Sequence, residues 1–327
     1  MRVLITNLFV LVMLWSCVDS PAPVSPPGDA DSARETDSGP PDARLPRETT
    51  PDAEPGGDLA PPPDAPPDVP VVTPPDGLEV VFLDVGQGDS ILLRFPEGST
   101  MLVDGGNKSA GPGIILPYLE GLHLTRLDYL VVTHPDADHC GGLDDVVYGV
   151  DIGAVWENGQ VADTWAWWDF SDAVDDEGVP RQVVSRGDEE TIDGCDVEVL
   201  NADEGWDDTN GNSIVLSIDC EGITVLLTGD AHQGTQMDLV DVFGDALRAD
   251  IVKIPHHGSP DRFRDFPAHV QPGIAVCSVG ANNTYGHPNP EVIGEWEDAG
   301  AAVYRTDEVG TVTVTAKDGA VGVELEW

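Results

Sequence analysis

The sequence predicts one α/β domain over residues 78–327, in which two mixed β-sheets pack together with helices outside. Strand-like and helix-like segments alternate irregularly along this region, unlike a regular βαβ repeat or an all-β sandwich. Hairpin-like pairs of strands stand at both of its ends. Residues 127–133 (LDYLVVT) form an unbroken apolar run, which is typical of a strand buried on both faces.

The elements follow from the local pattern of apolar, β-branched and turn-forming residues. Alternation or a short apolar run predicts strands over 78–84, 90–95, 100–104, 127–133, 196–200, 213–220, 223–228, 251–254, 274–279, 301–304, 311–315 and 321–326. Composition favours helices over 112–122, 164–174, 231–247 and 291–299. Gly86-Gln-Gly88 predicts a tight turn between the first two strands.

Residues 1–17 have the form of a bacterial lipoprotein signal peptide. Arg2 precedes an apolar run that is too short for a comfortable membrane span. Leu14-Trp-Ser-Cys17 resembles the box at which the cysteine is acylated and becomes the new N-terminus. We therefore expect an extracytoplasmic protein that Cys17 anchors to a bacterial membrane, either the outer membrane or the cell surface. An ordinary signal peptide or an uncleaved anchor is the alternative.

Residues 18–77 consist mostly of Pro, Asp, Ala, Ser and Gly, with almost no large apolar side chain. Such a segment cannot bury enough surface to offset the entropy lost on ordering. The composition predicts a disordered Pro/Asp-rich tether between the signal peptide and the domain at 78–327.

The whole chain is strongly acidic, with 60 acidic against 15 basic residues and a formal net charge of -45. Most of this excess lies in the domain, and a surface so acidic repels polyanions at low salt. The charge argues against tight, non-specific DNA binding, and adaptation to a saline habitat is its plainer explanation. We expect a monomer without a stable protein partner.

Polar clusters come directly after several of the predicted strands, where a rigid scaffold can hold side chains in fixed geometry. They lie at residues 104–106, 134–139, 228–230, 256–259 and 285–287. Five of the chain's eight histidines fall in them, a concentration that scattered structural histidines would not show.

The segment 133–139 (THPDADH) has four potential metal ligands in six residues, and Pro135 restricts its backbone. His134 and Asp136 can ligate one metal ion, while Asp138 and His139 ligate a second. Imidazole and carboxylate donors suit zinc or manganese, and paired ions of this kind lie about 3.5–4 Å apart. The pattern predicts a site for two divalent metal ions.

Several motifs in a fixed order carry a resemblance to a known family. They are Leu83-Asp-Val-Gly-Gln-Gly-Asp-Ser90, Val103-Asp-Gly-Gly106, Thr133-His-Pro-Asp-Ala-Asp-His139, Asn210-Gly-Asn-Ser213, Leu227-Thr-Gly-Asp230 and Pro255-His-His-Gly-Ser259. Together they resemble the ComEC-type metallo-β-lactamase domain, which is otherwise attached to the DNA-uptake channel of competent bacteria. The resemblance implies the αββα sandwich of that family and a metal-dependent hydrolase.

The resemblance also implies roles for residues outside segment 133–139. Asp230 would bridge the two metal ions, and one of His256 and His257 would complete the second site, with His257 slightly favoured. Asp104 would orient the 134–139 loop by accepting backbone or histidine hydrogen bonds.

The first metal site departs from the wider superfamily, which often has a third histidine there. This chain offers Asn210, Asn212 and Ser213 in that part of the sequence. The first site is therefore short of strong ligands.

The ligands imply hydrolysis by a metal-activated water. Asp138 would orient that water and accept its proton, while His287 and Ser259 would donate hydrogen bonds to the substrate oxygen. A structural role for His287 in a turn stays open.

We expect a phosphodiesterase or nuclease-like enzyme that acts on extracellular phosphoesters, such as nucleic acid or a cell-envelope polymer. The alternatives are hydrolysis of a lactam or thioester bond and a surface-displayed binding module that kept the scaffold without turnover.

Two of the cysteines stand on strands that can pair. An antiparallel register that sets Val197 opposite Ile218 also sets Cys195 opposite Cys220 on the buried face. Directly opposed residues can lie about 4.5 Å apart at Cα, which is within reach of a disulfide. We predict a Cys195–Cys220 bridge, with two small core residues as the alternative. Cys140 and Cys277 are expected to be buried thiols, although Cys140 also stands next to a ligand and could bind metal or pair.

Overall fold

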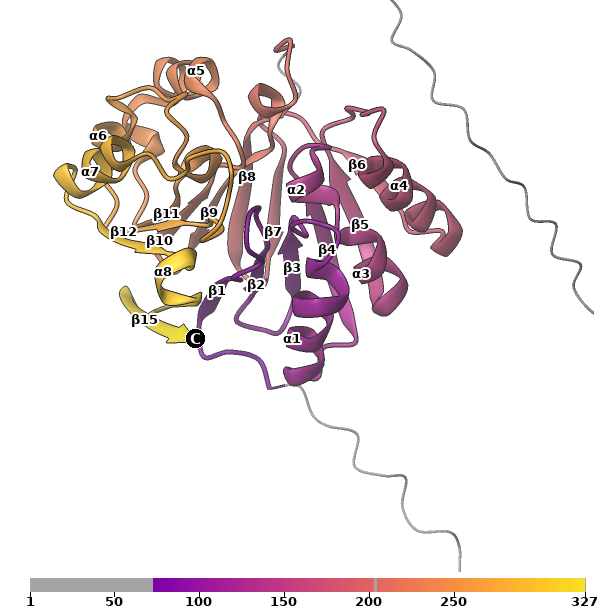
Figure 1. Cartoon of the computed structure of the whole chain (residues 1–327). Helices are drawn as coiled ribbons and strands as arrows, with labels where there is room; N and C mark the ends of the chain where they lie inside the picture. Colours follow the sequence, from indigo (N-terminus) through magenta and orange to yellow (C-terminus); the bar gives the residue numbers. More distant parts are fainter. Residues whose placement is uncertain (1–72, 203–204, 327) are drawn as a thin grey trace, which may run out of the picture. The chain divides into compact units, whose positions relative to one another are not determined.

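The computed structural model describes residues 73–202 and 205–326. Their strands form two mixed β-sheets that pack against each other with helices on both outer faces (Figure 1). This is the αββα sandwich expected from the sequence. The expected signal peptide with Cys17, and the expected tether up to residue 72, lie outside the described residues. Within those residues, no helix has both the length and the apolar character needed to cross a membrane.

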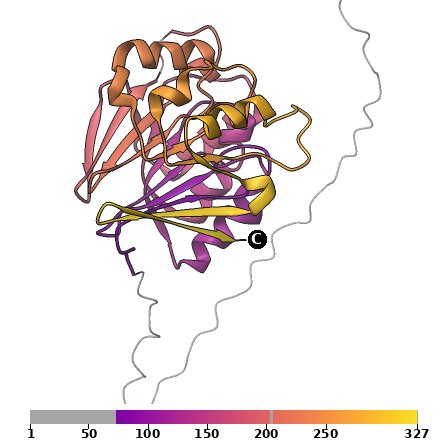
Figure 2. The same ribbon diagram turned by 90° about the vertical axis from the view of Figure 1, so that its left-hand side faces the viewer.

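The first sheet has eight strands among the described residues. In spatial order they are β15 (Ala320–Glu326), β14 (Thr311–Lys317), β1 (Leu78–Phe82), β2 (Ile91–Arg94), β3 (Thr100–Val103), β4 (Arg126–Val132), β5 (Asp151–Glu157) and β6 (Arg181–Val183). Strands from β15 to β3 pair antiparallel, and those from β3 to β6 pair parallel. The β14–β15 hairpin, drawn in yellow in Figure 2, therefore continues the sheet beyond β1.

The second sheet has seven strands in the same described ranges. In spatial order they are β13 (Ala302–Arg305), β12 (Ile274–Cys277), β11 (Ile251–Lys253), β10 (Ile223–Leu227), β9 (Val215–Cys220), β8 (Cys195–Asn201) and β7 (Glu189–Ile192). Strands from β10 to β13 run parallel, and those from β10 to β7 pair antiparallel.

Each sheet has its own helical layer, and buried apolar side chains join helix to strand. The helices on the first sheet are α1 (Leu116–Gly121), α3 (Leu143–Gly149) and α4 (Trp165–Glu177). Those on the second are α5 (Gln233–Phe243), α6 (Phe266–Val270) and α7 (Pro290–Asp298). The short elements are η1 (Gly111–Ile115), α2 (Ala137–Cys140), η2 (Asn210–Asn212), η3 (Gly244–Leu247), η4 (Pro255–Gly258) and α8 (Thr306–Val309).

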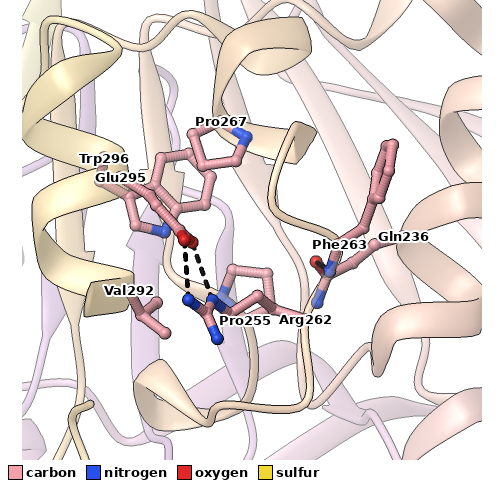
Figure 3. A pocket seen from close by; sticks show the side chains of 8 residues that line it. All are labelled: Gln236, Pro255, Arg262, Phe263, Pro267, Val292, Glu295 and Trp296. Carbon is pink, nitrogen blue, oxygen red and sulfur yellow. Dashed lines mark hydrogen bonds and ion pairs between the residues drawn. The ribbon is translucent and has the colours of Figure 1, made fainter. Parts of the chain in front are cut away.

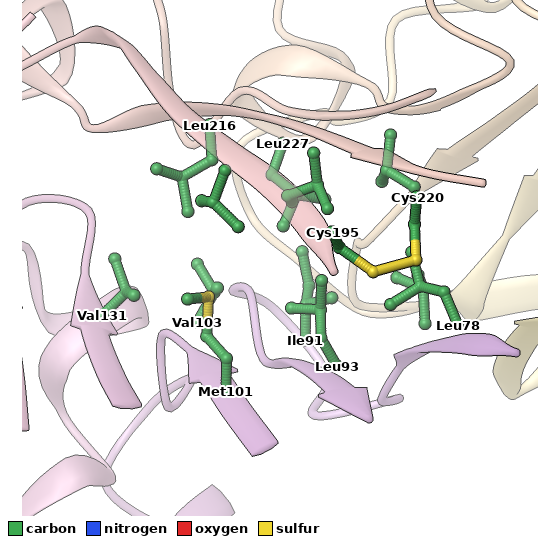
Figure 4. Packing of buried hydrophobic residues seen from close by; sticks show 14 of the residues in the cluster. Leu78, Ile91, Leu93, Met101, Val103, Val131, Cys195, Leu216, Cys220 and Leu227 are labelled. Carbon is green, nitrogen blue, oxygen red and sulfur yellow. A yellow bond between two sulfur atoms is a disulfide. The ribbon is translucent and has the colours of Figure 1, made fainter. Parts of the chain in front are cut away.

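The central core lies between the sheets, where both contribute their inward-facing side chains. Leu78 and Ile91 of the first sheet and Leu216 and Leu227 of the second belong to it (Figure 4). All four are at most 1% exposed. Full burial of one such side chain stabilises the fold by about 1.5–3 kcal/mol. This core therefore holds the two sheets together.

The predicted disulfide is present. Strands β8 and β9 pair in the predicted register, with Val197 opposite Ile218, and Cys195 is bonded to Cys220 with the Cα atoms 4.4 Å apart (Figure 4). The bridge lies in the core between the sheets. Cys140 and Cys277 are free and buried, as expected.

The helix predicted over 231–247 is shorter in the structure, and its last turn is separate. Helix α5 begins at Gln233 because the side chain of His232 caps it, with Nδ1 accepting a hydrogen bond from the backbone N–H of Thr235. It ends at Phe243 because Gly244 has φ 51° and ψ -120°, which no α-helix accommodates. Strands β5, β6 and β7 and helices α2, α3, α6 and α8 were not predicted.

Candidate metal centre

The polar clusters that follow the strands meet at one edge of the sandwich. In the first sheet Asp104 follows β3 and His134 comes soon after β4, which runs parallel to β3. In the second sheet Asp230 comes soon after β10 and His257 soon after β11, again a parallel pair. The carboxyl ends of parallel strands lie at the same edge of a sheet, so side chains far apart in the sequence converge there.

The segment after β4 turns sharply and brings together the four side chains that its sequence offers as candidate metal ligands. Asp136 is extended (φ -74°, ψ 149°) and precedes α2, and its carbonyl accepts the N–H groups of His139 and Cys140. The short helix then presents Asp138 and His139. The Oδ2 atom of Asp136 lies 3.7 Å from Nε2 of His134.

Asp104 fixes the orientation of both histidines in this segment. Its fully buried carboxylate accepts hydrogen bonds from N–H and Oγ1–H of Thr133, at 2.8 and 2.7 Å, and lies 2.7 Å from Nδ1 of His139. Thr133 Oγ1, which donates to Asp104, lies 3.0 Å from Nδ1 of His134 and can accept a hydrogen bond from its N–H. Both histidines then carry hydrogen on Nδ1 and keep the Nε2 lone pair free. These are the hydrogen bonds expected of Asp104.

A third imidazole faces the same point. Nδ1 of His257 lies 2.9 Å from the carbonyl oxygen of Ser278, so the hydrogen is on Nδ1. Its Nε2 lies 3.3 Å from Nε2 of His139. Two lone pairs at this distance repel unless a cation or a proton lies between them. Nε2 of His134 is buried and makes no hydrogen bond in the structure. The donor set therefore fits a bound metal cation.

Several groups of donors can hold a metal ion among the described residues. One consists of His134, His139 and Asp230, and another of Asp138, His139 and His257. Within each group, the ligand atoms lie within 4.8 Å of one another. The two groups share His139, and Asp230 reaches both. Its Oδ1 is 3.3 Å from Nε2 of His139, and its Oδ2 is 3.4 Å from Nε2 of His257.

His256 lies beside this cluster but belongs to none of those groups. Its Nε2 is 3.6 Å from Oδ2 of Asp230 and 3.3 Å from Nδ2 of Asn210. The structure thus groups His257, rather than His256, with Asp138 and His139. Both histidines have positive φ angles, 49° and 52°, a backbone conformation that costs about 1–3 kcal/mol and concentrates at functional sites.

The three residues expected near the first metal ion have different surroundings in the structure. Asn210 lines the pocket. Oγ of Ser213 accepts the backbone N–H of Asp230 and lies 3.4 Å from Nδ1 of His134. Asn212 points away, because its side chain hydrogen-bonds the backbone of Trp206 and Asp208.

Electrostatics favour a positive charge at this position. Burial alone would lower the pKa of His257, but Asp230 and Asp89 outweigh it and raise the pKa to about 9. Burial likewise opposes protonation of His139, yet Asp230 and Asp104 raise its pKa well above the usual value. Burial would raise the pKa of Asp230, but His257, His139 and Lys253 hold it well below its ordinary range. A divalent cation would satisfy the same carboxylates.

An open pocket lies over the cluster. It is lined by Gln87, Asp136, Asp138, Asn210, Asp230, His256, His257, Tyr285 and His287. Among these described lining residues, none is Lys or Arg. Burial together with His256 and His257 lowers the pKa of His287 to about 4, so this imidazole is neutral at pH 7. Ser259 does not line the pocket, and its Oγ accepts the N–H of Asp261, so its expected contact with substrate is not supported.

Two buried residues that were not identified as site residues from the sequence, Lys253 and Asp89, lie next to the candidate metal ligands. Nζ of the fully buried Lys253 lies 2.5 Å from Oδ2 of Asp89 and 3.4 Å from Oδ1 of Asp230, and it donates to the carbonyl of Gly229 at 2.6 Å. Asp89 is also buried. A lysine inside the apolar run 251–254 is the signal that could have indicated it, because lysine is seldom fully buried without a partner.

The turn at residues 86–88, which joins β1 to β2, also packs against Asp138. Gly88 has φ +126°, and a Cβ there would lie 2.1 Å from the carbonyl oxygen of Asp138. The next residue, Asp89, donates its N–H to that same oxygen at 3.2 Å. The turn therefore packs directly on the segment that carries the ligands, and Gln87 reaches the pocket.

Figure 3 shows a second hollow, which is lined by Pro255, the residue before His256, together with residues of α5, α6 and α7 and the segment after η4. Here Nε and one terminal nitrogen of Arg262 each donate to the carboxylate of Glu295 at 2.7 Å. The backbone N–H of Phe263 donates to Oε1 of Gln236 at 2.9 Å. These contacts tie the segment after η4 to α7 and α5, and so they support the position of the two histidines.

Comparison with known proteins places this architecture in a family. The model of the metallo-β-lactamase superfamily matches residues 83–266. The ComE operon protein 3 of Bacillus subtilis is 30% identical over 260 residues, which cover 73% of this chain and 33% of that protein. The competence protein ComA of Neisseria gonorrhoeae is 31% identical over 245 residues, covering 74% and 33%. The chain thus spans about a third of the length of these relatives.

Solved structures agree on the fold. A mutant of the β-hydroxylase CmlA superposes with a TM-score of 0.50 at 15% identity, covering 75% of this chain and 55% of that one. At such low identity the likeness concerns the fold alone. The family match, the ComEC-type relatives and the His/Asp donor groups confirm the expected resemblance. The chain therefore belongs to the metallo-β-lactamase superfamily of metal-dependent hydrolases.

Proposed function

We propose that this protein is a phosphodiester hydrolase that uses two divalent metal ions, zinc or manganese. The observation that carries the proposal is the pair of donor groups that share His139 and are both reached by Asp230. Paired ions that share a carboxylate ligand are common in enzymes that cleave phosphate esters. His134 and Asp136 would complete the first site, and Asp138 and His257 the second.

Bound there, the metal ions would supply Lewis acidity and a water of lowered pKa. The chain's own residues supply position and proton transfer. Oδ2 of Asp138, 3.5 Å from Nε2 of His257, faces the cluster, and the pKa of this carboxyl is lowered below its usual value. Burial opposes this shift, while His257 and His139 cause it. An ionised Asp138 can hold the attacking water and take its proton. The neutral His287 can donate a hydrogen bond to a substrate oxygen.

The pocket lining has three carboxylates and, among its described residues, neither Lys nor Arg, so an anionic ester would depend on the metal ions for its binding. A comparison nevertheless favours a phosphodiester over the other esters and amides. One relative, from Neisseria gonorrhoeae, is named a competence protein. Nucleic acid and envelope polymers are the phosphodiesters that such a protein would meet.

A substrate panel with defined metal content tests the proposal. The full chain is stripped of metal, reloaded with Zn²⁺ or Mn²⁺, and assayed on a phosphodiester, a β-lactam and a thioester. We expect metal-dependent cleavage of the phosphodiester. Elemental analysis should find up to two ions per chain, and Asp230→Ala should lose most of both because that carboxylate reaches both groups.

Two results would contradict the proposal. Cleavage of the lactam or the thioester alone would assign the site to a different bond, and metal binding without any turnover would indicate a binding module. Asp261→Ala is a matched control, because this carboxylate does not line the pocket and should leave metal content unchanged.

We also propose that the protein acts outside the cytoplasm and is held to a bacterial membrane by an acylated Cys17. The support is the apolar run and the Leu14-Trp-Ser-Cys17 box. The full chain should fractionate with membranes, while Cys17→Ala should release it or leave it unprocessed. A variant that stays membrane-bound with the same processed mass would argue against acylation at Cys17.

A further inference from the structure

Tyr285 presents an aromatic ring to solvent at the rim of the metal pocket. Its side chain lines that pocket and is 67% exposed, the highest value among the exposed tyrosines. The apolar face of an exposed aromatic ring is not stabilised by contact with water, so it is available to pack against a ligand. Its place beside the donor cluster means that a bound substrate is what would cover it.

The ring is held in position by its own turn. The side-chain oxygen of Asn283 accepts the backbone N–H groups of both Tyr285 and His287, each at 3.1 Å. Nδ2 of Asn283 donates to the carbonyls of Gly280 and His287 at 2.8 and 2.6 Å. Four hydrogen bonds from one side chain thus order the backbone that presents Tyr285, which reduces the entropy lost when a ligand docks on it.

A stack of rings leads from Tyr285 down to the metal ligands. The centroids of Tyr285 and His287 are 5.8 Å apart with an interplanar angle of 25°, and those of His287 and His257 are 6.4 Å apart at 29°. His257 belongs to the second donor group. The imidazole of His287 therefore lies between the exposed ring of Tyr285 and the ring of His257, and it is roughly parallel to each of them.

We propose that Tyr285 is the stacking platform for the base next to the scissile phosphodiester, which makes the substrate an unpaired nucleotide strand rather than a glycerol- or sugar-phosphate polymer. The inference rests on the proposed function and chooses between its two substrate classes. Stacking on an aromatic side chain tolerates every base because each has a π-face. Bases within a duplex already stack on their neighbours, so an unpaired base is the form that can dock.

The charge of the pocket favours the same conclusion. Its described lining lacks Lys and Arg, so the pocket itself offers no lysine or arginine to the phosphates next to the scissile one. A ligand whose affinity came from many phosphate contacts would find few partners here. A flat, uncharged base gives the acidic pocket a contact that does not depend on charge.

A binding experiment tests the platform separately from turnover. Titration calorimetry compares thymidine 5′-monophosphate with deoxyribose 5-phosphate on the metal-loaded full chain, since the two ligands differ by the base. Tyr285→Ala should weaken binding of the nucleotide about tenfold or more and leave the sugar phosphate unchanged. Tyr285→Phe should retain the affinity. Tyr148→Ala removes an exposed tyrosine of α3 that does not line the pocket and should have no effect.

The same variants are then assayed for hydrolysis of an oligothymidylate and of a glycerophosphodiester. We expect preference for the oligonucleotide, lost in Tyr285→Ala. Equal binding of the two phosphates by the parent, or equal loss of both in Tyr285→Ala, would overturn the platform. Better cleavage of the glycerophosphodiester would also overturn it while leaving the proposed function intact. Base-dependent binding through Tyr285 without cleavage of either diester would refute the hydrolase and support the platform.

Discussion

Lys253 is the side chain whose role in the site is clearest from its contacts. It is fully buried, and its ammonium group lies between the carboxylates of Asp89 and Asp230. Burial alone would lower its pKa, but these two carboxylates outweigh burial and raise the pKa. The lysine thus remains charged and holds Oδ1 of Asp230 on the side away from His256, which leaves Oδ2 to face the pocket histidines.

Replacing Lys253 by methionine should strongly destabilise the metal-free protein. The change leaves Asp89 and Asp230 buried without their cation, and breaking a buried pair of this kind costs about 3–5 kcal/mol. Urea unfolding of the stripped full chain measures the free energy of unfolding. The double variant Lys253→Met/Asp89→Asn should recover part of the loss, because one of the two unpaired charges is then neutral.

Lys317→Met provides the matched control. This lysine is exposed and pairs with Asp76, so its removal should change stability little. A Lys253→Met protein as stable as the parent would contradict the proposed charge compensation next to the candidate metal ligands.

At the level of the elements, the site depends on short connections that pack on one another. The 86–88 turn between β1 and β2 lies against the carbonyl of Asp138, and η4 presents two histidines in a left-handed conformation. Neither connection belongs to a long helix or strand. Their geometry is maintained because the strands before them are buried in the sandwich.

Two glycines of the same turn should respond differently to alanine. In Gly88→Ala the new Cβ has no room beside Asp138, so the ligand segment must move, and metal affinity should fall about 10- to 100-fold. Gly86 has φ +74° with no atom near its Cβ position. Gly86→Ala should therefore cost only the backbone strain of about 1–2 kcal/mol and keep the affinity.

Metal titration monitored by calorimetry distinguishes the two glycine variants, and thermal unfolding reports the strain that they share. Equal metal affinities in Gly86→Ala and Gly88→Ala would show that the contact with Asp138 does not position the ligands.

The Cys195–Cys220 bridge joins β8 to β9 and closes a loop with a sequence separation of 25. Loop closure of this size stabilises a protein by about 3 kcal/mol. Adding a reductant should lower the unfolding midpoint of the parent by a corresponding amount. The Cys195→Ala/Cys220→Ala variant should start from the lower midpoint and show no response to reductant. A response in that variant would place the effect elsewhere.

On the scale of the whole molecule, the formal net charge of -45 sets how the protein meets its substrate. A long-range negative field slows the approach of nucleic acid, and on such an acidic protein phosphate contacts add little to binding affinity. If the substrate is nucleic acid, as we propose, its affinity must come from short-range contacts in the pocket, namely with the bound metal ions, His287 and the ring of Tyr285.

Activity on single-stranded DNA should therefore rise, or stay level, as salt increases. Between 50 and 200 mM NaCl, with saturating metal, kcat/KM should not fall by more than about threefold, whereas proteins that bind through many phosphate contacts lose about 10³- to 10⁵-fold in affinity. Initial rates on a fluorescent oligonucleotide measure this. A steep fall of kcat/KM with increasing salt would show instead that basic residues bind the DNA phosphates.

Local patterns in the sequence were sufficient for much of the fold and for the ligand segments. Apolar runs and alternation located most strands, because a buried strand needs one or two apolar faces. The register of β8 on β9 could be derived for the same reason, and it led to the disulfide. Strands β6 (RQV) and β7 (EETI) were missed because both stand at sheet edges and are largely exposed, so nothing in them has to be apolar.

Only the tertiary structure decided which side chains meet. His256 and His257 are adjacent in the sequence, yet the backbone at η4 turns His257 into the donor cluster and His256 toward Asn210. Lys253, at the end of β11 in the second sheet, meets Asp89, in the connection between β1 and β2 of the first sheet, across a separation of 164 residues. Tyr285 reaches the pocket because Asn283 orders its turn. Which side chains come into contact depends on how the two sheets pack against each other. No local pattern in the sequence determines the distance between residues that lie on different sheets.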